Sequence, residues 1–276
     1  MLECILPPCI RYRLKFIWIR GRPSYENQMM IVDAHSHLGY DYVFEEDFTT
    51  AKLLNKMERN NIAVSIVQPG TVLDLESVIK QHNNIADLST KMRGRIFGIA
   101  NPNPHLPFND YYGELERCVN ALGFVGVKLH PLAHAVNPSS LHGKKVFQAA
   151  LDLDIPVIVH TGVGGPWALP SSLIPIAMEF PRLKIVLAHA GGAMFSNEAA
   201  LAARLCPNIY LETSWLPSIT IHSLCKTLGA DRLMFGSDHA ENAETELTKY
   251  RTIGLNEKEL EWCLGNTALK VFDIQV

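Results

Sequence analysis

The 276-residue chain lacks the patterns that mark several common classes of protein. Its six cysteines are scattered and form no C-x-x-C pair, which indicates reduced thiols of a cytoplasmic protein and not a disulfide framework. Its 25 Lys and Arg do not outnumber its 28 Asp and Glu, so a nucleic-acid-binding surface is not expected. No internal repeat or low-complexity tract occurs. The 47% of hydrophobic residues are enough for a large core in a single domain.

The first 28 residues do not match the rest of the chain. Basic residues interrupt their apolar part, so no stretch reaches the ~20 residues of a transmembrane helix. No small-residue cleavage site follows, which argues against a secretory signal. We expect residues 1–28 to be an N-terminal extension, disordered or due to a misassigned start, and residues 29–276 to form one domain. A membrane-surface anchor is the alternative.

From Ile31 onward, short apolar segments alternate with segments of helical spacing. Helices between strands indicate βαβ units and a parallel sheet, and about eight such units close into a barrel. The pattern therefore predicts an α/β fold, a (β/α)8 TIM-like barrel, with a last helix over Glu257–Phe272. The expected strands are Ile31–His37, Ala63–Gln68, Ile96–Ala100, Val125–His130, Val157–His160, Lys184–His189, Ile209–Thr213 and Leu233–Asp238.

Several of these strands end on residues that can bind a metal ion. His35 and His37 lie in the first strand, and His160, His189 and Asp238 end three later strands. Side chains alternate along a strand, so the first two histidines point the same way. The C-terminal ends of parallel strands meet on one face, which carries the active site of a barrel. Imidazole and carboxylate ligands suit Zn, Mn or Fe, and the sequence therefore predicts a catalytic divalent-metal centre.

This ordered set resembles the amidohydrolase superfamily. More narrowly, it is similar to the branch that includes aminocarboxymuconate-semialdehyde decarboxylase and many metal-dependent hydrolases. The resemblance extends from Ile31 to about Phe272 and is specific for the fold, but not for the substrate. Further phrases typical of that branch are Gly126-Val127-Lys128-Leu129-His130-Pro131, Ala188-His189-Ala190-Gly191-Gly192, Gly236-Ser237-Asp238 and Gly265-Asn266-Thr267-Ala268.

The resemblance implies a distorted barrel with one divalent ion, which we expect to be Zn, with Mn or Fe as alternatives. It implies that His35, His37, His160 and Asp238 are the metal ligands. His189 would lie beside the metal-bound water as activator or proton shuttle, and Asp238 could also accept a proton from that water. An imidazole is suited to this transfer near neutral pH.

Lys128 is a third predicted catalytic residue, and several roles stay open for it. It has the same phase as His130, so both side chains could face the mouth of the barrel. In other branches of the superfamily, a lysine at this strand end is carbamylated and bridges two metals. In the branch that this chain resembles, Lys128 would bind a substrate anion or brace the site. A pairing with Asp33, which shares the phase of His35 one layer deeper, is the remaining alternative.

The remaining polar and aromatic residues near the strand ends have less certain roles. Trp167 and Trp215 could form walls of a substrate pocket or pack within loops. Glu212 could be buried for structural reasons or be catalytic. His239 is out of phase with Asp238 and is left out of the ligand set. Three further histidines are expected to be solvated: His134, His142 and His222.

The leading function is a metal-dependent hydrolase that uses a metal-activated water on a C–N or C–O bond of a small organic substrate. The alternative is a non-oxidative decarboxylase of a small unsaturated or aromatic acid. It needs a cation for the substrate carboxylate, which Lys128 could supply. A non-catalytic metal-binding barrel is disfavoured because every expected ligand position is filled. We expect a small-molecule substrate and neither nucleic acid nor membrane as a partner, and a homodimer stays open.

Overall fold

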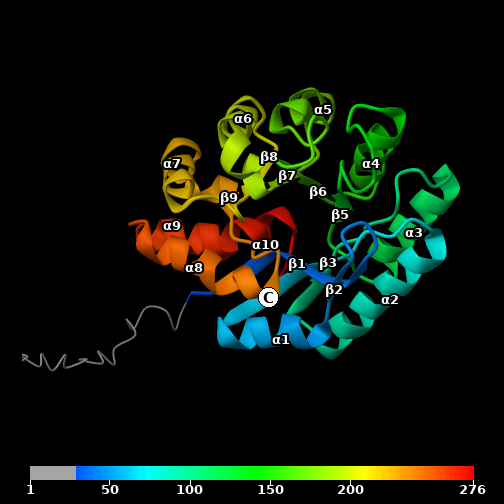
Figure 1. The fold of residues 1–276 in the computed structure, drawn as a ribbon, viewed down its shortest axis with the longest axis horizontal. Helices are drawn as coiled ribbons and strands as arrows, with labels where there is room; N and C mark the ends of the chain where they lie inside the picture. The colour runs from blue at the N-terminus through cyan, green and yellow to red at the C-terminus, as the bar shows by residue number, and fades with distance from the viewer. Residues whose placement is uncertain (1–28) are drawn as a thin grey trace, which may run out of the picture.

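The computed structural model describes residues 29–276, so the expectations for residues 1–28 lie outside it and stay predictions. Figure 1 shows parallel strands surrounded by helices. All eight expected strands are present, with both ends within four residues of those predicted. The strands are β1 (Ile31–Asp41), β2 (Glu46–Phe48), β3 (Ile62–Pro69), β4 (Ile96–Gly98), β5 (Val127–Leu129), β6 (Val157–His160), β7 (Ile185–Ala188), β8 (Ile209–Glu212) and β9 (Leu233–Met234).

Helices follow the strands along the chain and pack their apolar faces on the sheet. The side chains of Thr49, Asp74 and Ser140 cap three of them by accepting a backbone N–H. The helices are α1 (Thr50–Arg59), α2 (Leu75–Lys91), α3 (Phe108–Asn120), α4 (Leu141–Asp152), α5 (Ile174–Glu179), α6 (Gly192–Leu205), α7 (Ser218–Leu228), α8 (Ala243–Thr252), α9 (Glu257–Glu261) and α10 (Thr267–Val271). Between residues 29 and 276, no helix combines the length and the apolar composition needed to cross a membrane.

The strands form two sheets that meet along two seams. One sheet has the order β2-β1-β3-β4, and the other has the order β5-β6-β7-β8-β9. At one seam Ala100 pairs with Val127, and at the other Ser36 pairs with Asp238, both in parallel. The N–H of Asp238 donates to the carbonyl of His35 at 2.8 Å. These bonds close the ring, and the predicted (β/α)8 barrel is confirmed.

An apolar cluster separate from the helix-packed core fills the barrel below its mouth. It takes alternate residues of the strands, and Val271 and Phe272 of the C-terminal segment join it. Burial of each such side chain stabilises the fold by roughly 1.5–3 kcal/mol. Polar residues replace the apolar ones toward the strand ends, where the site lies. The strand residues of this cluster include Val64, Ile66, Ile99, Ile158, Val186 and Met234.

The β1 strand departs from regular alternation at the site. Its pairing with β3 shifts register between Asp33 and Ser36. Asp33 and Ser36 therefore both contact Lys56 of α1, with Nζ–oxygen distances of 2.6 Å. The prediction that Asp33 shares the phase of His35 is wrong for this reason, because a bulge reverses the side on which side chains emerge.

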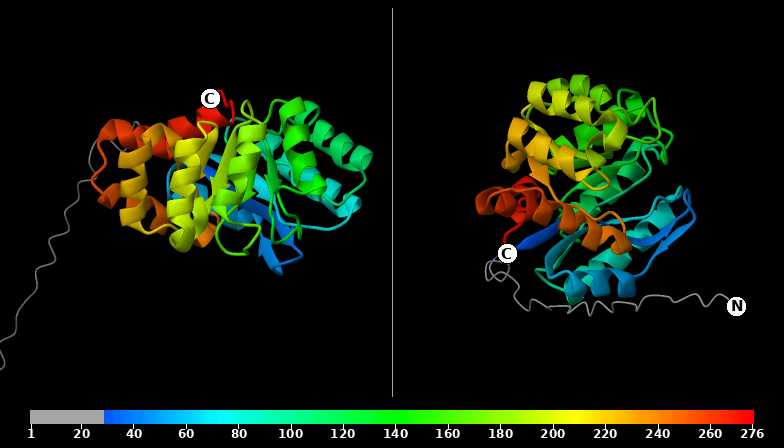
Figure 2. Two further views of the ribbon diagram at one scale, coloured as in Figure 1. Left: turned by 90° about the horizontal axis from the view of Figure 1, so that it is seen from above. Right: turned by 60° about the vertical axis from the view of Figure 1, so that its left-hand side comes forward.

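The β1 strand is also longer than predicted. It continues to Asp41 and pairs with β2 in an antiparallel hairpin, with Gly39 opposite Phe48. Asp41 holds the turn by accepting the N–H groups of Val43 and Phe44, each at 2.9 Å. Figure 2 shows this hairpin, drawn in blue, projecting beyond the neighbouring strands. It places aromatic side chains beside the mouth of the barrel.

The predicted C-terminal helix is interrupted. A π-helical turn over Trp262–Asn266 separates α9 from α10. Within this turn Gly265 lies against the start of β1, where an added Cβ would come within 2.4 Å of the Met30 carbonyl oxygen. The turn thus lets the backbone approach β1 closely, which a continuous helix with a larger residue would prevent.

Candidate metal centre

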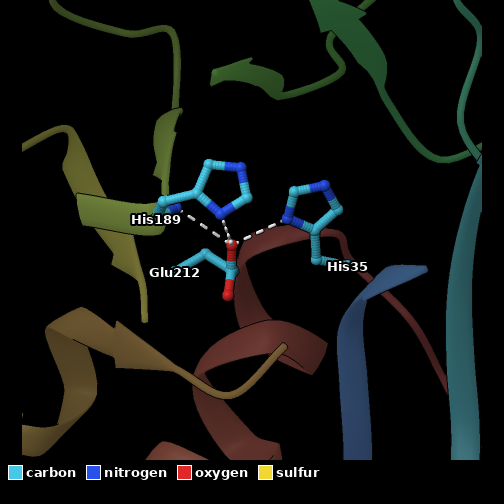
Figure 3. A group of neighbouring side chains, drawn as sticks. All are labelled: His35, His189 and Glu212. Carbon is cyan, nitrogen blue, oxygen red and sulfur yellow. Dashed lines mark hydrogen bonds and ion pairs between the residues drawn. The ribbon is translucent and has the colours of Figure 1, made fainter. Parts of the chain in front are cut away.

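Glu212, at the end of β8, lies at the centre of the buried polar network. One of its carboxylate oxygens is 2.7 Å from Nδ1 of His35 and 3.1 Å from the backbone N of His189 (Figure 3). Ser214 donates its N–H to the other oxygen at 2.6 Å. An acceptor surrounded by donors in this way supports the orientation of the two histidines. The sequence analysis left the role of Glu212 open, and the structure assigns it to the site.

The hydrogen bonds around Glu212 also fix where His35 and His189 carry their protons. The Ser214 hydroxyl donates to Glu212 at 3.0 Å, so its oxygen accepts from Nδ1 of His189 at 2.7 Å. His35 likewise carries its proton on Nδ1, facing Glu212. Both rings therefore present an unprotonated Nε2. Burial lowers the pKa of His35 well below its usual value and that of His189 to about 3, which favours the neutral rings.

The Nε2 atoms of His35 and His37 meet Asp238. Its Oδ1 lies 3.3 Å from Nε2 of His35 and 3.1 Å from Nε2 of His37. Gln68 points its amide N toward the same His37 nitrogen, at 3.0 Å, which fits a lone pair at that atom. Two nitrogen lone pairs and a carboxylate oxygen, all within 4.8 Å of one another, are a donor set for a divalent ion. The residues thus fit the metal that the sequence predicts.

The second oxygen of Asp238 is held from outside the cavity. The indole N–H of Trp215 donates to Oδ2 at 2.8 Å, and the backbone N of Trp215 donates to Glu246 at 2.9 Å. Asp238 and Trp215 both have left-handed backbones, with φ of 60° and 66°. Such residues cost of order 1–3 kcal/mol each and persist only where their surroundings hold them. Trp215 therefore orients Asp238 and does more than pack within its loop.

A family model described as amidohydrolase matches residues 32–274. The chain belongs to the amidohydrolase family. The expectation of an enzyme of this superfamily is confirmed. The group of His35, His37 and Asp238 lies at the strand ends of this amidohydrolase barrel, the face on which the sequence predicts the metal.

Similar proteins carry out several reactions. The chain is 23% identical over 174 residues to a 2-keto-4-carboxy-3-hexenedioate hydratase from Sphingobium sp.; the match covers 49% of this chain and 50% of that protein. The chain thus spans about half the length of that relative.

Two solved structures show the same fold. The 5-carboxyvanillate decarboxylase from Sphingomonas paucimobilis has a TM-score of 0.73 and is 14% identical. The match covers 90% of this chain and 100% of that one. A dihydroxybenzoic acid decarboxylase from Polaromonas sp., with manganese and 2-nitroresorcinol bound, has a TM-score of 0.70 and 18% identity, over 89% of this chain and 97% of that one.

The remaining predicted ligand of the amidohydrolase set, His160, lies across the cavity from the other three. It ends β6, and its Nε2 donates to the carbonyl of Val163 at 2.8 Å. Its ring stacks on that of His130, with centroids 4.0 Å apart, and contacts His189 at 4.9 Å. The structure thus brings His35, His37 and Asp238 together, and a ligand role for His160 stays a prediction.

Lys128 lies in β5 and is buried beside His35. Its Nζ is 3.3 Å from Nε2 of His35. Burial lowers the pKa of Lys128 to about 8. The alternative that it pairs with Asp33 is wrong, because Asp33 binds Lys56 at 2.6 Å. Asp33 instead accepts the N–H of Ser237 at 2.9 Å and so supports the residue next to Asp238.

A cavity of about 220 Å³ opens beside these residues. Phe44 and Phe48 of the β1–β2 hairpin line it, as do Thr71 and Asn101. A second hollow of about 290 Å³ lies next to it and shares His37 and Asp238 with it. The site can therefore hold a small molecule next to the predicted metal.

Three further histidines lie near the site, and one of them, His134, differs from expectation. His134 is buried, whereas we expected it to be solvated. His239 lines the cavity with its Nε2 3.7 Å from Asp238. His82 forms a buried group with Glu114 and Cys118, but its Nδ1 faces Glu114 at 2.6 Å and its Nε2 accepts the N–H of Asn101 at 2.9 Å. Both His82 nitrogens are thus occupied, and the group positions a cavity residue.

Proposed function

We propose that the protein is a metal-dependent hydrolase that acts on a C–N or C–O bond of a small organic molecule. The observation that carries this proposal is the geometry of His189. Its Nδ1–H is engaged by Ser214, which leaves Nε2 as the free nitrogen of a ring that lines the same cavity as His37 and Asp238 and lies 5.0 Å from the ring of His35. A fixed neutral imidazole in this position is suited to take a proton from an attacking water.

The residues that would hold the ion are His35, His37 and Asp238, with His160 as the proposed fourth ligand. We propose Zn as the ion, with Mn as the alternative because the dihydroxybenzoic acid decarboxylase from Polaromonas sp. has manganese bound. A bound divalent ion would supply Lewis acidity, which activates water near neutral pH. The free thiols of the described cysteines support a cytoplasmic location as part of the proposal.

The surrounding residues handle protons and charge. Nε2 of His189 accepts a proton from the attacking water and donates it to the leaving nitrogen or oxygen. Ser214 and Glu212 stabilise the ring while it is charged, because its Nδ1–H points into their network. Lys128 extends a donor into the same cavity and would polarise the substrate carbonyl or bind an anionic group.

A non-oxidative decarboxylase is the second candidate. Decarboxylation needs a cation near the carboxylate that is lost. Among the described residues no arginine lines the cavity, so Lys128 is the residue that would supply this charge. Two decarboxylases also have this fold. The same His35, His37 and Asp238 group would serve either reaction.

The test begins with elemental analysis of the purified protein, followed by assays of lactones, amides and aromatic acids. Hydrolysis without CO₂ release supports the hydrolase, and CO₂ release from an aromatic acid makes the protein a decarboxylase. The variant His189→Asn should lose either activity while it keeps its metal. A protein that binds no divalent ion would overturn both candidates.

A further inference from the structure

The imidazole of His130, at the end of β5, has its proton position fixed by the backbone. The N–H of Ala133 donates to Nδ1 of His130 at 3.2 Å. A neutral imidazole that accepts at Nδ1 must carry its proton on Nε2. Within residues 29–276 no hydrogen bond engages this Nε2–H, and the ring lines the cavity. His130 therefore offers the cavity a hydrogen-bond donor.

Packing holds this donor in one orientation. The ring of His130 lies nearly parallel to that of His160, at 11° and 4.0 Å between centroids. Phe44 of the hairpin contacts it at 5.4 Å. The backbone N–H of His130 is in turn bound by Nδ1 of His134 at 3.2 Å. A donor fixed in this way loses little entropy when it binds a ligand.

The charges around the cavity favour an anion on the side where His130 lies. Asp41 is occupied by three backbone N–H groups, those of Val43, Phe44 and Thr71. One oxygen of Asp238 accepts the indole N–H of Trp215, and the other faces the Nε2 atoms of His35 and His37 at the candidate metal site. Lys128, two residues before His130, is the cation that lines this cavity from β5. Glu46, a further carboxylate of the lining, lies 3.6 Å from Nε2 of His239, on the hairpin side. Lys128 and His130 thus place a cation and a hydrogen-bond donor two residues apart on the β5 side of the cavity.

We propose that His130 and Lys128 together form the subsite that binds a carboxylate of the substrate. The inference rests on the proposed function only in placing the substrate in this cavity. If the enzyme is a hydrolase, the carboxylate is a recognition group that survives the reaction. If it is a decarboxylase, the same contacts hold the group that is lost.

The test is equilibrium binding of two probes to the manganese-loaded protein by calorimetry. The probes are 2,6-dihydroxybenzoate and resorcinol, which share a ring and two hydroxyls but differ in the carboxylate. The variant His130→Phe keeps a flat ring against His160 and removes the N–H. Lys128→Met is an independent second variant. His142→Phe is the matched control, because His142 is exposed and does not line the cavity.

Wild type should bind the acid more tightly than resorcinol. His130→Phe and Lys128→Met should each weaken binding of the acid by about 10-fold or more, as expected for a lost hydrogen bond to a charged group, with little change for resorcinol. The control should behave as wild type. A wild type that binds both probes equally, or neither, overturns the inference. So does an acid preference that survives both variants. Because binding needs no turnover, a lack of hydrolysis would count against the proposed function alone.

Discussion

At the scale of single residues, hydroxyl and indole groups orient the side chains that we propose as metal ligands and as the base. Ser214 has one proton and gives it to Glu212, which obliges His189 to keep its own proton on Nδ1. Trp215 takes one oxygen of Asp238 and leaves the other for the cation site. Each of these effects depends on which group donates a hydrogen bond, and one substitution can remove each donor.

We expect His189→Asn to lower kcat by roughly 10²–10⁴, the range for general acid–base catalysis. Metal content, measured by elemental analysis, should stay near that of wild type. Ser214→Ala should give a smaller loss of kcat, because the imidazole stays but its proton position is no longer fixed. Loss of metal from the His189 variant would instead make His189 a ligand.

Trp215→Phe keeps the ring and removes the donor to Asp238. We expect it to weaken divalent-metal affinity by about 10–100-fold, as is usual when a group that orients a ligand is removed. Titration calorimetry with Mn²⁺ measures this. Trp167→Phe is the control, because Trp167 is similarly exposed, at 40% against 50%, and makes no contact with Asp238. Equal affinities in the two variants would remove Trp215 from the support of the site.

Whether His160 binds the metal is tested by comparing its variant with variants of the three residues that the structure brings together. His35→Ala, His37→Ala and Asp238→Asn should each lower bound metal, because each removes a donor of the compact set. If His160 moves away from Val163 to bind the ion, His160→Ala should lower it as well. Full metal content in the His160 variant would show that three side chains suffice.

At the scale of elements, the bulge in β1 separates what the sequence could predict from what it could not. Alternation predicts that His35 and His37 share a side, and the structure agrees because Nε2 of each ring faces Oδ1 of Asp238. It fails for Asp33, which precedes the bulge. No local signal in Asp33 to His37 reveals the bulge. The carboxylate of Asp33 forms an ion pair with Lys56 of α1 instead.

The Asp33–Lys56 pair leads to a stability prediction. Burial alone would raise the pKa of Asp33, but Lys56 and Ser237 bring it below its usual 3.8. A carboxyl whose folded-state pKa is depressed stabilises the fold above its unfolded pKa, and this contribution is lost as pH falls through the lower folded value. Lys56→Met leaves a buried carboxylate unpaired and should destabilise the fold by about 3–5 kcal/mol at neutral pH.

Urea unfolding measured across pH checks both statements. The difference between wild type and the Lys56→Met variant should shrink as the pH falls into the acid range, where Asp33 becomes protonated. Lys52→Met is the control on the same helix, because Lys52 pairs with Glu241 at the surface. Exposed pairs contribute little. A difference that does not depend on pH would mean that lost packing, and not charge, causes the destabilisation.

Other elements also differ in whether the sequence predicts them. The eight parallel strands are visible in the sequence because each is a short apolar run that a helical segment follows. The β2 strand has no such signal: Glu46–Phe48 is short and exposed, and its pairing depends on the extension of β1. Glu212 was left open because one strand residue does not reveal which hydrogen bonds it accepts. Its partners come from β1 and the residues that follow β7.

At the scale of the whole molecule, the site lies where the two sheets join. His35 and Asp238 belong to one seam, and at the other the backbone N–H of Lys128 donates to the carbonyl of Ala100. A divalent ion held by His35, His37 and Asp238 would therefore bind both sheets at once. Metal that binds the folded state alone stabilises it by about 2.7 kcal/mol at a concentration 100 times its Kd.

Adding a chelator should therefore lower the melting temperature of metal-loaded wild type, measured by scanning calorimetry. The Asp238→Asn variant should show a smaller decrease, because it holds less metal to remove. A melting temperature unchanged by the chelator, in protein shown to lose its metal, would mean that the seams are stable without the ion.

The β1–β2 hairpin has a consequence for how such an enzyme can change its substrate. Phe48 stacks on His37 at 4.8 Å, and Phe44 reaches His130 at 5.4 Å, so one short excursion of the chain spans the pocket from the cation side to the β5 side. Its tip is exposed and does not belong to the barrel ring. Changes in the length of its tip or at Phe44 alter the width of the pocket on the β5 side, whereas Phe48 also packs on His37 at the candidate metal site. Selection can therefore retune which molecules enter without rebuilding the chemistry.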